Sequence, residues 1–194
     1  MNQKGQGLLE ALIATTIIVV GLSGIIGLAG NNLVASNIST GELLAVNLAR
    51  EAVEVVTNLR DSNYLDNEIE WNDGLDTGTN DREGIIKYDD INHTWSVDFL
   101  GLNTDFTDSA TIVYLDSTTG LYRQNNLEVS GWEATPYRRL VYLYRICGTD
   151  IDTFLENGQC PGGAVGYRIL AKVQWDDHGN TRELSLEKRI FNWR

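Results

Sequence analysis

The stretch KGQGLLEALIATTIIVVGLSGIIGLAG, residues 4–30, decides how this chain is built. No charged residue occurs from Ala11 to Gly41, and only three hydroxyl side chains interrupt the apolar and glycine residues of 11–29. Roughly 20 apolar residues at a helical rise of ~1.5 Å per residue match a hydrocarbon core of about 30 Å. The sequence therefore predicts a helix that spans a bilayer.

The rest of the 194 residues has the composition of an acidic globular domain. Hydrophobic residues at 42% and charged residues at 22% exclude a wholly disordered, a collagen-like or a polytopic membrane protein. All but four of the 27 acidic residues and all but three of the 15 basic residues lie beyond residue 60. The net charge of -12, without a basic stripe, argues against nucleic acid as a partner.

Charges beside the apolar run predict its orientation. Lys4 and the N-terminal amine are the cations that can hold the short end in the cytoplasm, so the acidic bulk is expected outside. We therefore expect a single-pass protein of the cytoplasmic membrane with an extracytoplasmic C-terminal domain.

A second helical pattern covers residues 42–60 and is amphipathic. We expect Asp61-Ser62-Asn63 to end this helix, and we consider a break around Gly30-Asn31-Asn32 between the two helical patterns. One face of 42–60 is thus predicted to pack on a globular domain. Its apolar positions are Leu44, Leu48, Ala52, Val55, Val56 and Leu59.

Beyond residue 63 the pattern changes to loops and strands. The segment 63–84 is rich in Asp, Asn, Gly and Thr and is predicted to be a surface loop. Strands that follow one long helix predict an α+β fold with a mainly antiparallel sheet. The predicted strands are His93–Leu100, Ala110–Asp116, Leu121–Asn125, Arg138–Cys147, Gly166–Trp175 and Arg182–Trp193.

The N-terminal motif Lys4-Gly5-Gln6-Gly7-Leu8-Leu9-Glu10, followed at once by the apolar run, resembles the prepilin signal of type IV pilins and minor pseudopilins. The resemblance implies cleavage after Gly5 by prepilin peptidase and N-methylation of the new terminus Gln6, where many family members have Phe or Met. Glu10 then becomes the fifth residue, the family's position for a subunit-assembly carboxylate. The implied organisation is a leader of residues 1–5, a filament-core helix of 6–41 and a pilin-like domain of 42–194.

Weaker similarity to minor prepilin-like subunits extends further along the chain. It covers 48–52 with 60–64, the hairpin of 114–116 with 120–123, and the ending 191–193. The resemblance implies a minor pilin or pseudopilin subunit of a type IV pilus or type II secretion pseudopilus. Its partners would be prepilin peptidase, other subunits and the cytoplasmic membrane.

The position of Glu10 also carries an energetic cost. A carboxylate in a membrane helix costs about 2.5–3.5 kcal/mol at full depth, so it needs the interface or a partner. The free amine of a neighbouring subunit can be that partner, and an ordinary position at the headgroup level is the alternative.

Two alternatives concern the N-terminal segment as a whole. A secretory signal peptide could end at Gly27-Leu28-Ala29, although its apolar stretch would be longer than usual. The chain could also be a permanently anchored binding or adhesin-like domain that never polymerises. Gly21, Gly24, Gly27 and Gly30 fit close helix packing, and they equally fit the ordinary frequency of glycine in membrane helices.

Catalytic and metal motifs are weak in this sequence, so we expect neither an enzyme nor a cofactor. His93 and His178 lack partnered motifs, and Asp73, Asp76 and Asp81 do not have EF-hand spacing, which favours a solvated acidic loop over a calcium site.

Cys147 and Cys160 lie in the part expected to be exported. An oxidising compartment permits a disulfide between them, and two reduced buried cysteines are the alternative.

Overall fold

The computed structural model describes residues 3–66, 68–76, 83–89, 91–101, 104–124, 131–148, 154–155, 160, 163–177 and 179–193. The chain divides into two compact units, Met1–Glu42 and Leu43–Arg194. The helix α1 (Gln3–Leu65) contributes its first part to one unit and its remainder to the other.

The helix α1 is 63 residues long and unbroken through Gly30-Asn31-Asn32, so the break considered there does not occur. Gly costs only about 1 kcal/mol relative to Ala in a helix, and the neighbouring apolar residues sustain helical geometry. The helix also continues to Leu65, two residues past the expected stop. The side chain of Asn63 does not take hydrogen bonds from the backbone of the helix. Its amide instead donates to the carbonyl oxygens of Trp71 and Asp73.

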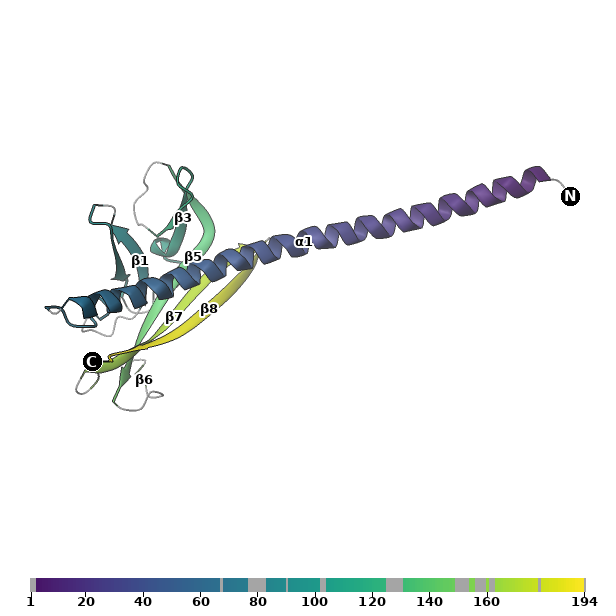
Figure 1. The fold of residues 1–194 in the computed structure, drawn as a ribbon. Coiled ribbons are helices and arrows are strands. Elements are labelled where there is room, and N and C mark those ends of the chain that lie inside the picture. Colours follow the sequence, from purple (N-terminus) through teal and green to yellow (C-terminus); the bar gives the residue numbers. More distant parts are fainter. Residues whose placement is uncertain are drawn as a thin grey trace. The chain divides into compact units, whose positions relative to one another are not determined.

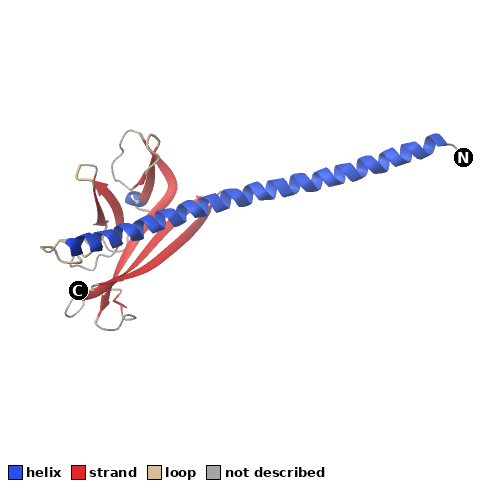
Figure 2. Cartoon of the chain, viewed as in Figure 1, coloured by secondary structure: helices blue, strands red, loops and turns tan. Residues whose placement is uncertain are grey.

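The second unit contains a sheet built around one long strand, β5 (Trp132–Cys147) (Figures 1 and 2). One edge of β5 pairs with β7 (Ala164–Asp177), which pairs in turn with β8 (Asn180–Phe191). Every pairing among the described strands is antiparallel. The other edge of β5 pairs with β1 (Glu83–Asp89), β3 (Ile112–Asp116) and β6 (Phe154–Leu155), and two hairpins add β2 (Thr94–Phe99) and β4 (Tyr122–Arg123).

The main core lies between one face of this sheet and α1 from Ala45 onward (Figure 1). Alternate residues of β5 and β7 face the helix, as the two-residue period of a strand requires. The α+β fold with a helix on an antiparallel sheet is therefore confirmed. The buried helix residues are Ala45, Leu48, Ala49, Ala52, Val53, Val55 and Val56, and their partners on the sheet include Val141, Leu143, Ile169, Val173 and Ile190.

A smaller core covers the opposite face of the sheet. Ile85 and Leu140 are fully buried there with Ala110, which belongs to the short 3-10 helix η1 (Ser109–Thr111). Asp108 caps η1 by accepting a hydrogen bond from the backbone of Ala110 at 2.8 Å.

The largest differences from the predicted strands are two wrong bounds and two strands that were not predicted. β5 begins at Trp132 rather than Arg138, and residues 110–111 belong to η1 rather than to a strand. The sequence does not predict β1, whose first two residues fall in the segment expected to be loop. It does not predict β6 either.

Candidate functional site

The first unit presents an exposed apolar segment, which we define as residues 7–37 of α1. Every described side chain in this range is exposed, including large ones that normally lie in a core. Among the described residues, α1 is the one helix long and apolar enough to cross a membrane. The most exposed large side chains of the apolar segment are Leu8, Ile17, Val20, Ile26, Leu28 and Leu33.

Glu10 is the acidic residue of this apolar segment, and it is exposed. Among the side chains that the structure describes, which begin at Gly7, none carries a basic group at ion-pair distance from the Glu10 carboxylate. Its described neighbours three or four residues away on the helix are Gly7, Ile13 and Ala14, none of which carries a charge. The segment therefore carries a negative charge on an apolar surface, without a counter-charge among the described side chains of residues 7–37.

Gly5 and Gln6 lie in the first turns of α1. Cleavage between them and methylation of Gln6 stay predictions. The four glycines Gly21, Gly24, Gly27 and Gly30 make no close contacts with the described residues, because a Cβ added at any of them would meet nothing within 4 Å. Packing among the described residues therefore does not explain why these four positions are glycine.

The second unit carries a buried cation between α1 and the sheet. Arg139 of β5 has no exposed surface, and its guanidinium donates to Glu51 Oε2 at 2.7 Å and to the carbonyl oxygen of Leu48 at 3.0 Å. Its Nε donates to Gln124 Oε1 at 2.8 Å. Burial lowers the pKa of Arg139 from its usual value, and the charge of Glu51 opposes that shift.

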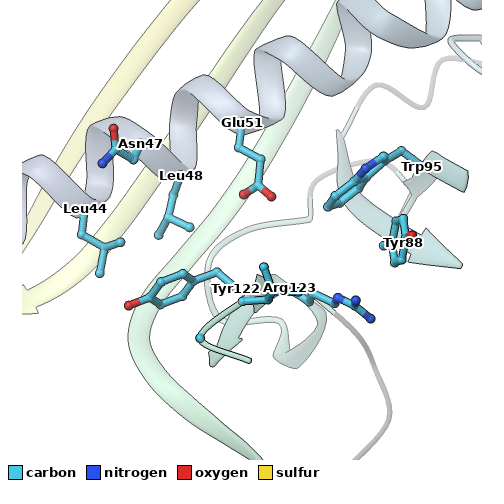
Figure 3. A pocket seen from close by; sticks show the side chains of 10 residues that line it. Leu44, Asn47, Leu48, Glu51, Tyr88, Trp95, Tyr122 and Arg123 are labelled. Carbon is cyan, nitrogen blue, oxygen red and sulfur yellow. The ribbon is translucent and has the colours of Figure 1, made fainter. Parts of the chain in front are cut away.

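Beside Glu51 lies a pocket of about 590 Å³, which we call the aromatic pocket (Figure 3). The helix supplies one wall, and the β1–β2 and β3–β4 hairpins supply the others. The sequence does not reveal this pocket, because its walls come from three separate regions and one of them, β1, has no recognisable strand pattern. The lining residues are Leu44, Asn47, Leu48, Glu51, Tyr88, Trp95, Gly120, Leu121, Tyr122 and Arg123.

The acidic residues considered for calcium take different roles in the structure. Asp76 pairs with Arg145, whose Nε donates to Asp76 Oδ2 at 2.7 Å, and it accepts a hydrogen bond from Tyr167 at 2.7 Å. Burial raises the pKa of Tyr167 well above its usual value, and the hydrogen bond to Asp76 adds to this shift. Asp73 is exposed, and Asp81 lies outside the described residues.

The two histidines are not brought together by the described structure. His93 is exposed with a positive φ of 53°, and its Nδ1 lies 3.2 Å from the phenolic oxygen of Tyr88. His178 lies outside the described residues.

Cys147 and Cys160 are joined in a disulfide, with their Cα atoms 5.3 Å apart. Cys147 is the last residue of β5, so the bond ties this end of the central strand to a residue 13 positions later.

Comparisons of the chain with protein-family models, with curated proteins and with solved structures return no match.

Proposed function

We propose that this chain is a structural minor pilin or pseudopilin subunit of a type IV pilus or type II secretion pseudopilus. It is inserted in the cytoplasmic membrane with its acidic domain outside, trimmed after Gly5 by prepilin peptidase and assembled with other subunits. Its role is mechanical rather than catalytic.

The observation that carries this proposal is the exposed apolar segment with the carboxylate of Glu10 on its surface. A helix that is apolar on all sides must be covered by lipid or by other helices. Lipid alone leaves Glu10 without a counter-charge, whereas a parallel neighbour offset along the helix axis brings a free amine to it. The prepilin-like motif around Gly5 supports the same function.

The arrangement of α1 in the second unit also supports the proposal. Residues 45–56 are held by the main core, so this part of the helix is built into the globular domain. An apolar helix that continues from such an anchored part suits a subunit whose domain is displayed by a helical filament core.

Intact mass and N-terminal sequencing of protein extracted from native membranes test the proposal. We expect the mature chain to lack residues 1–5 and to begin with N-methylated Gln6. A terminus at Met1 would favour the permanently anchored binding domain, and a terminus near Gly30 would favour a cleaved secretory signal. Either result would overturn the proposal.

A further inference from the structure

The aromatic pocket is lined by leucine and aromatic side chains, with a few polar and charged side chains among them. Tyr88 and Trp95 are direct cross-strand partners in the β1–β2 hairpin, with ring centroids 4.9 Å apart. Tyr122 lies beneath Leu44 and Leu48 across the pocket from Trp95 (Figure 3). Aromatic and leucine surfaces therefore face one another across a space large enough for a small molecule.

The charges at this pocket give little net attraction to a strongly charged ligand. The guanidinium of Arg123 lies 4.6 Å from the ring centroid of Tyr88, so a cation would meet both a positive charge and an occupied ring face. The carboxylate of Glu51 points into the pocket, but its charge is already paired with Arg139 (Figure 3). A neutral ligand suits this balance of charges.

Several polar groups in the lining have no hydrogen-bond partner among the residues that the structure describes. Within the described part of the chain, the side-chain amide of Asn47, the indole N–H of Trp95 and the hydroxyl of Tyr122 make no hydrogen bond. Glu51 uses Oε2 for Arg139, which leaves Oε1 as an acceptor. Together these groups offer donors and acceptors around aromatic faces.

We propose that the aromatic pocket binds a neutral pyranose sugar ring. A pyranose has C–H faces that stack on aromatic rings and hydroxyl groups at its rim that both donate and accept hydrogen bonds. The stacking surfaces are Trp95 and Tyr122, and the hydroxyl groups are bound by Asn47 and Glu51. This binding does not depend on filament assembly, so it can be tested whether or not the chain polymerises.

The test is an array of immobilised pyranosides probed with the full chain in a sugar-free detergent, since alkyl glycosides would compete. The array carries neutral hexosides, uronic acids and amino sugars. We expect retention on one or more neutral hexosides and weaker retention on both charged classes. No retention on neutral hexosides, or stronger retention on a charged class, would overturn the proposal.

Variants connect the binding to the pocket. Trp95→Ala removes a stacking surface and should lower affinity roughly tenfold or more, whereas Trp95→Phe should restore part of it. Asn47→Trp fills the mouth from an exposed helix position, so it tests the pocket without disturbing the core. Ile91→Ala is the matched control, because Ile91 is 89% exposed in the turn between β1 and β2 and lies outside the pocket.

The two pocket variants also show whether a retained sugar sits elsewhere on the chain. Unchanged sugar binding by Asn47→Trp and Trp95→Ala would place the sugar outside the aromatic pocket and refute the assignment. Near-ultraviolet circular dichroism checks the fold of Trp95→Ala. If that variant is misfolded, Asn47→Trp alone decides the outcome.

Discussion

Trp193 donates its backbone N–H to the phenolic oxygen of Tyr64 at 2.9 Å, and the two rings stack with centroids 4.6 Å apart. The Tyr64 hydroxyl donates in turn to Asn192 Oδ1 at 2.7 Å. The guanidinium of Arg60 covers the Trp193 ring at 4.2 Å from its centroid. The last turns of α1 are thereby tied to the residues that follow β8.

Substitution of Tyr64 should separate the contributions of its ring and its hydroxyl. Tyr64→Phe keeps the stacking but loses the hydrogen bonds, so we expect a loss of about 1–2 kcal/mol in the free energy of unfolding. Tyr64→Ala should cost about 3–5 kcal/mol, because a buried ring is removed. Urea denaturation in mild detergent measures both, with Leu65→Ala at an 87% exposed neighbour as the control. Equal stability of Tyr64→Phe and the original chain would mean that the hydroxyl contributes nothing.

Loss of Glu51 should destabilise the second unit more than loss of an exposed acid on the same helix. Glu51→Gln leaves the fully buried Arg139 without its counter-charge. We expect a cost of about 2–3 kcal/mol, below that of a fully buried pair because Glu51 is partly exposed. Glu54→Gln, on the exposed side of α1, is the control and should change stability little. Similar denaturation midpoints for the two variants would contradict this prediction.

The raised pKa of Tyr167 predicts a specific sensitivity to alkali. Above the ordinary tyrosine pKa of about 10, the unfolded chain releases this proton while the folded chain keeps it, so stability falls as pH rises. The slope from this group approaches about 1.4 kcal/mol per pH unit. Tyr167→Phe should be less stable at neutral pH, because it loses the hydrogen bonds with Asp76 and Asn72, yet it should lose less stability as the pH rises above about 10. Parallel stability curves for the two proteins would refute this.

Removal of the disulfide should weaken one end of the central strand. The double variant Cys147→Ser with Cys160→Ser loses a crosslink over 13 positions, for which chain entropy predicts roughly 3 kcal/mol. A nonreducing digest of exported protein should contain one linked peptide pair. Two alkylatable thiols in that material would show that the bond does not form there.

Assembly should depend on the charge of Glu10. Glu10→Gln keeps the size of the side chain but cannot pair with an amine, so we expect processing after Gly5 to persist while filament incorporation falls roughly tenfold or more. Glu54→Gln, which removes an exposed acid from the part of α1 held by the domain, should assemble normally. The measurement is the amount of processed protein in membranes and in sheared filaments, for each variant and the original chain expressed at equal levels. Equal incorporation of Glu10→Gln and the original chain would leave Glu10 as an interfacial residue only.

The periodic parts of the fold were predictable from sequence. Leu48, Ala52 and Val56 recur at helical spacing, and all are buried against the sheet. The exposed apolar segment was equally visible, because no charge interrupts residues 11–41.

The strand β1 and the start of β5 were not predicted, because their sequences lack a regular pattern of apolar and polar residues. Residues 83–86 of β1 are all buried, so the strand shows no alternation of apolar and polar residues. The early start of β5 was hidden by Pro136, which usually argues against a strand. Here the register against β3 shifts between Ile112 and Tyr114, and such an irregularity accommodates a proline.

The order of elements along the chain has a consequence for synthesis. Residues 45–56 of α1 share a core with β7 and β8, which are made last. At translation rates of about 5–20 residues per second, the end of β8 follows this helix roughly 7–27 s later. Until then the apolar face of the nascent helix lacks the part of the sheet that β7 and β8 supply. The unfinished chain therefore exposes apolar surface for several seconds, and such surface is prone to aggregation.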